Sequence, residues 1–374
     1  MAKASGVLTV LFLILLLLTG CTGTAGVQGP QGPAGAQGLP GIAGPVGAPG
    51  LQGTAGSAGV PGLPGTAGTA GTQGPPGTSL NPLQIALLRW YEANQVPTNF
   101  TVGDKPHCVV WDRIDIWVTN AASNNVIRLK TSDGSQLGTY RVGNWPVGIA
   151  FDGANIWVAN YNDNTVTKLR ASDGLLVGTY AVGIGPVGIA FDGVNIWVTN
   201  SGSNTVTKFR RDGSTVGTYA VGTEPVGIAF DGVNIWVANA GSNTVTKLRA
   251  SDGSLVGTYA VGAKPHGIAF DGGYIWVANR SENTVTKLRA SDGSKVGTYA
   301  VGIMGTVGYA PSCIAFDGEY IWVANNAENT VTKLRASNGS TVGTYAVGIG
   351  PVGIAFDGAN IWATNAGSNT VSKL

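Results

Sequence analysis

Hydrophobic and polar positions follow one pattern that repeats along the last three-quarters of the chain, at spacings of 40, 40, 39, 40, 46 and 40 residues. A typical copy opens with an apolar Pro-Val-Gly-Ile-Ala-Phe segment, continues through Ile-Trp-Val between polar residues, and closes with Gly-Thr-Tyr-Ala-Val. A tryptophan marks each copy, and the seven are Trp117, Trp157, Trp197, Trp236, Trp276, Trp322 and Trp362. Because such a period with strand-forming residues is typical of a propeller blade, the pattern predicts an all-β, seven-bladed propeller over residues 97–374.

Four strands are predicted in each copy. In the second copy they span residues 147–152, 155–160, 165–171 and 175–182. Asp-Gly pairs supply the turn chemistry between strands. Trp157 stands in the middle of its strand, and seven such tryptophans are expected to pack in the core between blades rather than to form a sugar-stacking surface.

The seventh copy ends after its third strand. A matching fourth-strand sequence, Thr-Asn-Phe-Thr-Val-Gly at residues 98–103, stands just before the first copy. We expect this N-terminal strand to pair with the C-terminal one and to complete the seventh blade, because closure removes the open sheet edges.

The first residues have the features of an export signal. Lys3 precedes an apolar run at residues 7–18, which is too short to span a bilayer. The run ends in Leu18-Thr19-Gly20-Cys21, which is similar to a bacterial lipobox. That resemblance implies removal of residues 1–20, diacylation of Cys21, and a lipid anchor that holds the mature protein in the cell envelope or on the outer surface.

Residues 21–78 are collagen-like. Nineteen glycines stand at every third position from Gly23 to Gly77 without a break. Only glycine fits the crowded axis of three wound chains, so the period predicts a triple helix and a homotrimer rather than a flexible linker. The segment resembles bacterial collagen-like regions.

Residues 79–96 predict a short helix. Asn81 and Pro82 suit its first turn, and Leu83, Leu87 and Trp90 recur at helical spacing. A helix of this length is marginal alone. It is therefore expected either to align three chains or to dock on the flank of the propeller, and both alternatives stay open.

The net charge and the positions of the histidines and cysteines limit the kinds of partner and site that we expect. The formal net charge is only +2, which predicts no nucleic-acid partner. Cys108 and Cys313 occupy the same slot of the first and sixth copies, and the blade between them predicts two free thiols. His107 and His266 belong to copies three blades apart, so neither a metal site nor a cofactor is expected.

Polar residues that recur in every copy are interpreted as structural. The Lys-x-Arg pairs of the third strands, such as Lys168 and Arg170, are expected to be solvated charges that discourage edge-to-edge pairing. Asn160 and Asn164 bracket the loop after the second strand. They are expected to cap that loop through Asx turns rather than to bind calcium.

Residues that differ between copies gather in two sets of loops, one before each first strand and one after each second strand. We expect both sets at one mouth of the central channel, where they would form a ligand-binding face. The loop before the sixth copy is six residues longer than the others. The candidate residues are His107, Trp145, Tyr161, Glu224, Lys264, His266, Arg280, Met304 and Tyr309.

The repeat resembles the YVTN family of β-propeller repeats, at residues 116–120 (Ile-Trp-Val-Thr-Asn) and again at residues 196–200. That resemblance implies an exported protein with a binding or scaffolding role. The Pro-His-Gly-Ile segment at residues 265–268 is similar to one in streptogramin lyases, which are also seven-bladed. The second histidine and the glutamate that those enzymes place nearby have no counterpart at residues 311–313 (Pro-Ser-Cys).

The sequence therefore predicts a surface-displayed, non-enzymatic propeller on a collagen-like stalk, with a binding, adhesion or scaffolding role. Its ligand would be a protein or a glycan. One alternative is a lyase-like or hydrolase-like propeller enzyme with its site at the channel mouth. The other is a structural spacer with no specific ligand.

Overall fold

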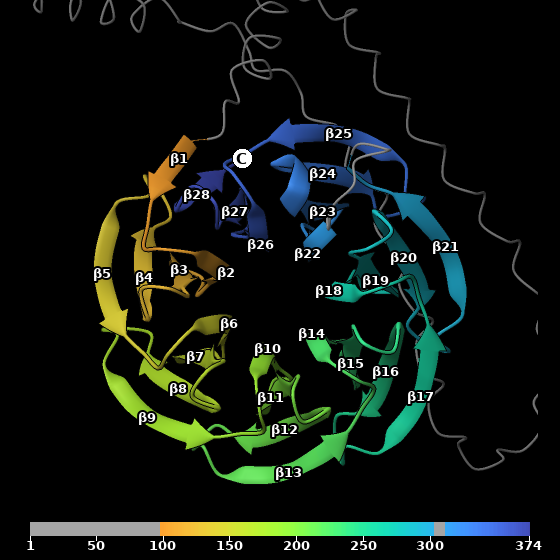
Figure 1. Cartoon of the computed structure of the whole chain (residues 1–374), viewed down its shortest axis with the longest axis horizontal. Helices are drawn as coiled ribbons and strands as arrows, with labels where there is room; N and C mark the ends of the chain where they lie inside the picture. The colour runs from red at the N-terminus through yellow and green to blue at the C-terminus, as the bar shows by residue number, and fades with distance from the viewer. Residues whose placement is uncertain (1–97, 303–310) are drawn as a thin grey trace, which may run out of the picture. The chain divides into compact units, whose positions relative to one another are not determined.

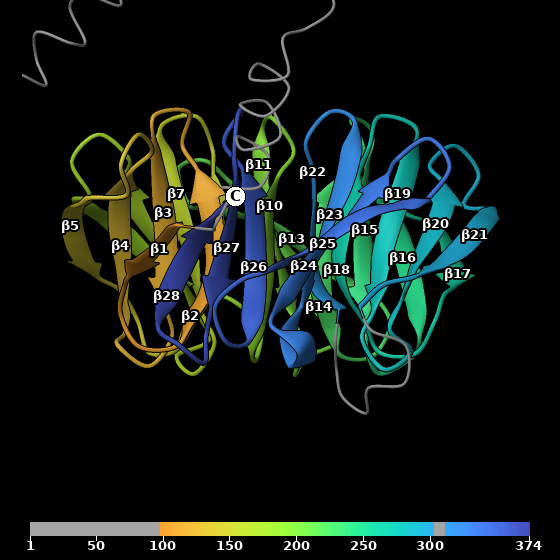
Figure 2. The ribbon, with the colours of Figure 1, turned by 90° about the horizontal axis from the view of Figure 1, so that it is seen from above.

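The computed structural model describes residues 98–302 and 311–374, which form a closed ring of seven four-stranded antiparallel sheets, or blades (Figure 1). The strands run between two faces of the ring, and the loops gather at these faces (Figure 2). This arrangement confirms the predicted all-β propeller. The predicted signal peptide, collagen-like segment and linker helix lie outside the described residues.

Each blade repeats the same four strands from the inside outward. The innermost strands are β2 (Pro106–Trp111), β6 (Pro146–Phe151), β10 (Pro186–Phe191), β14 (Pro225–Phe230), β18 (Pro265–Phe270), β22 (Pro311–Phe316) and β26 (Pro351–Phe356). The second strands are β3 (Asp115–Asn120), β7 (Asn155–Asn160), β11 (Asn195–Asn200), β15 (Asn234–Asn239), β19 (Tyr274–Asn279), β23 (Tyr320–Asn325) and β27 (Ile361–Asn365). The third strands are β4 (Asn125–Lys130), β8 (Thr165–Arg170), β12 (Thr205–Arg210), β16 (Thr244–Arg249), β20 (Thr284–Arg289), β24 (Thr330–Arg335) and β28 (Thr370–Lys373). The outermost strands are β5 (Gln136–Arg141), β9 (Leu176–Ala181), β13 (Thr215–Ala220), β17 (Leu255–Ala260), β21 (Lys295–Ala300) and β25 (Thr341–Ala346), and a short 3-10 helix, η1 (Asn326–Glu328), follows β23.

The seventh blade takes its outermost strand from the N-terminal side of the propeller. β1 (Thr98–Thr101) pairs antiparallel with β28, placing Thr98 opposite Lys373 and Thr101 opposite Thr370. The sheet order β1-β28-β27-β26 confirms the predicted closure. Because β1 leads directly into the loop before β2, its first residue lies at the opposite face of the ring from that loop.

Glycine in the innermost strands allows neighbouring blades to approach closely. β6 and β7 pair Ala150 with Trp157, but their register shifts between Pro146 and Ile149. A Cβ atom on Gly148, inside this irregular stretch, would lie 1.9 Å from the carbonyl oxygen of Val187 on β10. The backbones of adjacent inner strands thus pack against each other without side chains between them.

The repeated tryptophans form the core, as predicted. Six of the seven are fully buried, and Trp322 is 8% exposed. Trp157 packs with Ile196, Val198 and Phe209 of the following blade. Its indole N–H donates to Asp152 Oδ2 at 2.8 Å, so the polar atom of this buried ring is satisfied.

The lysines of the third strands correct the sequence interpretation. Lys168 is only 7% exposed and Lys208 only 3%, so neither is a solvated charge. Lys208 Nζ donates to the carbonyl oxygens of Ala250 (2.7 Å) and Ser251 (3.0 Å) in the next blade, and it lies 4.9 Å from the centre of the Trp197 ring. The prediction was wrong because the sequence of one strand says nothing about the neighbouring blade. The backbone carbonyls of that blade accept hydrogen bonds from the ammonium group and so allow it to be buried. Arg170 is exposed, as expected, and pairs with Asp173.

Candidate functional site

The two sets of variable loops lie at one face of the ring, as predicted, because they hydrogen-bond to each other. The backbone N–H of Tyr161 donates to the carbonyl of Trp145 at 3.0 Å. Arg280 makes the equivalent bond to Lys264, also at 3.0 Å. We call this face the mouth; it comprises the loops that precede the innermost strands and those that follow the second strands.

A cavity of about 330 Å³ opens at the mouth between the fourth and fifth blades. Four of the residues predicted from the sequence line it together. The full lining is Glu224, Val226, Ala240, Lys264, His266 and Arg280. The cavity thus combines two cations, one carboxylate and one imidazole, whereas Val226 and Ala240 supply apolar wall.

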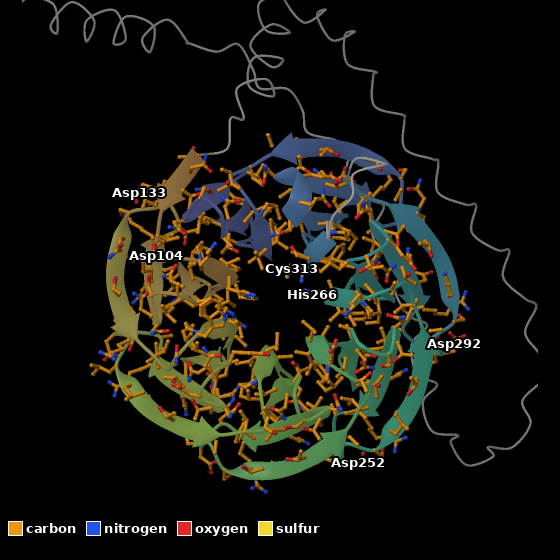
Figure 3. The ribbon with its side chains drawn as sticks, viewed as in Figure 1. Asp104, Asp133, Asp252, His266, Asp292 and Cys313 are labelled. Carbon is orange, nitrogen blue, oxygen red and sulfur yellow. The ribbon has the colours of Figure 1, made fainter. Side chains whose placement is uncertain are left out.

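A second cavity of about 160 Å³ lies deeper, among the innermost strands, and shares His266 and Val226 with the first. His107, Cys108 and Cys313 also line it, together with glycine and aliphatic residues of β6, β10, β14 and β18. Figure 3 shows His266 and Cys313 at the inner side of the ring. The ring therefore brings both histidines to the same cavity, although they belong to blades that are three apart.

Both imidazoles are held neutral. Burial, and then the nearby Arg280 guanidinium, lower the pKa of His107 and that of His266 to about 4. His266 Nδ1 lies 2.9 Å from the carbonyl oxygen of Ser312. A carbonyl can only accept, so Nδ1 carries the proton, and Nε2 of the neutral ring is left as an acceptor.

The two cysteines of the propeller are free thiols, as predicted. Burial raises the pKa of Cys108 and that of Cys313. The thiolate is the reactive form of cysteine, so these shifts disfavour nucleophilic chemistry at both positions.

The residue before the innermost strand adopts a left-handed backbone conformation in blade after blade, a feature that the non-glycine residues at this position do not reveal. The φ angle is 57° at Trp145, 51° at Glu224 and 54° at Lys264. Lys105, which sequence reasoning missed, has the same geometry with φ at 54°. The available signal was glycine at the equivalent positions, Gly185 and Gly350, since glycine is the residue that favours positive φ.

Asparagines of the preceding blade hold this conformation. Asn164 Oδ1 accepts from the backbone N–H of Gly185 at 2.8 Å, and Asn243 Oδ1 accepts from that of Lys264 at 2.9 Å. The sequence interpretation assigned Asn164 to its own loop, but its side chain supports the mouth loop of the following blade.

The other candidate residues fall into two groups. Trp145 and Tyr161 are each 40% exposed at the mouth of the second blade and line neither cavity. Met304, Tyr309 and the predicted lipidation site Cys21 lie outside the described residues.

Carboxylates elsewhere in the ring have structural roles. Asp133, Asp252 and Asp292 lie at the outer rim (Figure 3), where hydrogen bonds from the serine two residues later lower the pKa of each. Within residues 98–302 and 311–374, no cluster of three or more histidine, cysteine or acidic side chains is arranged to hold a metal ion. The same part of the chain has no helix with the length and hydrophobicity of a transmembrane span.

These features define a seven-bladed propeller with a polar cavity at its mouth, in a chain that also carries a collagen-like segment. A sequence model of the collagen triple helix repeat matches residues 20–79, in 20 copies. No curated protein sequence matches the chain.

Solved propellers resemble the structure closely in fold. A streptogramin B lyase shares 21% identity at a TM-score of 0.63, covering 74% of this chain and 95% of its own. Hydrazine synthase from Kuenenia stuttgartiensis shares 19% identity at a TM-score of 0.65, covering 76% and 98%. A catalytically inactive virginiamycin B lyase from Staphylococcus aureus, with quinupristin, shares 19% identity at a TM-score of 0.64, covering 74% and 98%. The structural similarity establishes the fold, but sequence identities this low leave the activity of this chain open.

Proposed function

We propose that this protein is a non-enzymatic recognition module displayed at the cell surface. In this proposal the chain is exported and anchored through lipid on Cys21, the collagen-like segment trimerises, and each propeller binds a protein or a glycan at its mouth. Three linked heads would bind a multivalent surface with higher avidity than one.

One observation carries the proposal: the differences between nearly identical blades converge on the mouth. Glu224, Lys264 and Arg280 come from variable loops, and together with His266 they line one cavity. If the loops served only to connect strands, their side chains would not need to meet in a cavity of a size suited to a ligand.

The path of the chain supports display. β1 begins at Thr98 on the face opposite the mouth, since its other end leads into the mouth loop before β2. The chain therefore enters the propeller at the face opposite the mouth and leaves the mouth open at that point.

Three measurements test the proposal. The mass of the mature protein in solution should correspond to three chains, and a monomer at ordinary concentrations would contradict the stalk and its avidity. Adhesion of the full chain to surfaces coated with extracellular proteins and glycans should fall when Lys264 and Arg280 are replaced together. A Cys21→Ala variant should leave the membrane fraction if lipid anchors the chain.

A lyase-like enzyme is the second candidate, and the meeting of His107 and His266 in one cavity favours it. Incubation with a cyclic depsipeptide ester such as quinupristin, followed by mass spectrometry, distinguishes a lyase-like enzyme from a binding module. Ring opening that disappears in a His266→Ala variant would replace the binding proposal with catalysis.

A further inference from the structure

Taking the mouth as a binding site, as proposed above, we infer that its ligand is an acidic oligosaccharide. A carboxylate of the sugar would be bound beside Lys264 and Arg280, sugar hydroxyls by His266 and Glu224, and a sugar ring by the exposed Trp145.

The backbone of the mouth is the first step in this inference. Left-handed backbone is energetically unfavourable for a non-glycine residue. Gly185 and Gly350 adopt it freely in two blades, yet four other blades have Lys105, Trp145, Glu224 and Lys264 in this conformation. Because glycine suffices for the fold, the side chains at these positions are best explained by a contact outside the fold.

Charge indicates an anionic group. Lys264 Nζ lies 3.9 Å from Glu224 Oε2, and both side chains are more than half exposed, so this ion pair is weak and leaves Lys264 able to bind a ligand. Arg280 adds a second cation to the lining of the cavity. With His266 neutral, the charged groups of the lining are two cations and one carboxylate.

Hydrogen-bonding capacity indicates a sugar rather than a simple anion. His266 offers Nε2 as an acceptor, because its Nδ1 proton is donated to Ser312. Glu224 supplies further acceptors, while Lys264 and Arg280 supply donors. Sugar hydroxyls both donate and accept, so they can match this mixed set.

The aromatic residues complete the site. All seven repeat tryptophans are buried, whereas Trp145 is 40% exposed, as is Tyr161 beside it. Each presents an apolar face with a polar edge, which suits the C–H face of a pyranose ring. A ligand of several sugar units is required, since Trp145 is in the second blade and the cavity lies between the fourth and fifth.

The test uses the full-length protein and matched pairs of probes: oligogalacturonate, hyaluronan oligosaccharides and the neutral methyl ester of each, measured by isothermal titration calorimetry. We expect at least one acid to bind about tenfold or more tightly than its ester, a difference of about 1.4 kcal/mol. The preference should shrink in high salt, because a mouth with this exposure is screened.

Glycine substitutions remove the side chain and should preserve the backbone conformation, since glycine already occupies this position in two blades. Lys264→Gly should abolish most of the preference for the acid, and Trp145→Gly should weaken acid and ester alike. Lys295→Gln, which removes an exposed cation on the outermost strand of the same blade, should change neither.

Three results would overturn the inference. Equal binding of acid and ester, or acid binding that survives Lys264→Gly, would show that the mouth does not recognise an anionic group. No binding of any of these sugars would show that the ligand is not an acidic oligosaccharide. In each case adhesion of the full chain to protein-coated surfaces decides separately whether the proposed recognition function stands.

Discussion

The hydroxyl of Thr364 in the last blade donates a hydrogen bond of 2.7 Å to the carbonyl oxygen of His107 in the first blade. It joins two blades that are far apart in sequence. Thr119 and Thr199 make equivalent bonds to the blades that follow them, whereas alanine stands at this position in the second, fourth, fifth and sixth blades.

Thr364→Val should therefore destabilise the closed ring. The substitution keeps the shape of the side chain but leaves the His107 carbonyl without this donor, and we expect a loss of about 1–2 kcal/mol in the free energy of unfolding. Urea denaturation followed by tryptophan fluorescence measures it. Thr364→Ser, which retains the hydroxyl, is the control and should stay close to the native value; a valine variant as stable as the serine variant would argue against a role for this bond.

The lysines of the third strands offer a second test, because Lys333, which is only partly buried, lacks the carbonyl partners. Lys208→Met removes two hydrogen bonds from a charged donor and should cost about 3 kcal/mol. Lys333 lies 3.8 Å from the Tyr320 ring centre and 4.7 Å from the Trp322 ring centre, but it donates no hydrogen bond within the described parts of the chain. Lys333→Met should cost about 1 kcal/mol. Equal losses in thermal or urea unfolding would show that ring contact, not hydrogen bonding, stabilises the lysines.

Acid should weaken the propeller before its carboxylates titrate. His107 and His266 have a pKa of about 4 in the folded state, below the ordinary value of 6.5. At a pH between these two values, the unfolded chain therefore binds more protons than the folded chain. Their contribution is fully present above pH 6.5 and is lost as the pH falls from 6.5 towards 4. The urea midpoint should fall across this window, and a variant with glutamine at both positions should show a flatter profile.

Alanine substitutions at two glycines distinguish the effect of steric crowding on stability from the effect of backbone strain. Gly148→Ala would place a methyl group 1.9 Å from a backbone oxygen of the next blade, so the inner strands must move apart, and we expect a loss of about 3 kcal/mol or failure to fold. Gly153 has a φ of 97° but nothing within 4 Å of the added atom. Gly153→Ala should cost only about 1 kcal/mol. Comparable unfolding midpoints for the two variants would contradict the close packing of the inner strands.

The sequence predicted the ring well because its information is local and repeated. Trp157 and its six equivalents marked the blades, and the match of residues 98–103 to a fourth strand predicted the closure correctly. The seven copies therefore determined blade number and strand order without any knowledge of long-range contacts.

The site was less predictable because it depends on contacts between blades. Lys208 has the sequence environment of a surface residue, and only the carbonyls of the next blade make its burial possible. Likewise, nothing in the type of Lys105 indicates a left-handed backbone. The convergence of Glu224, Lys264, His266 and Arg280 follows from the ring geometry that brings the fourth and fifth blades side by side.

The borrowed strand also gives the propeller a mechanical property. Six blades are built from consecutive strands of one continuous chain, but the seventh is held closed by the four residues of β1. Because the chain enters the propeller at Thr98, tension applied from the N-terminal side loads β1 and the Phe100–Trp362 ring contact before any other sheet. A head bound at its mouth and pulled from its N-terminal side would thus yield first at the closing strand, so the strand that completes the ring is also the one through which force enters it.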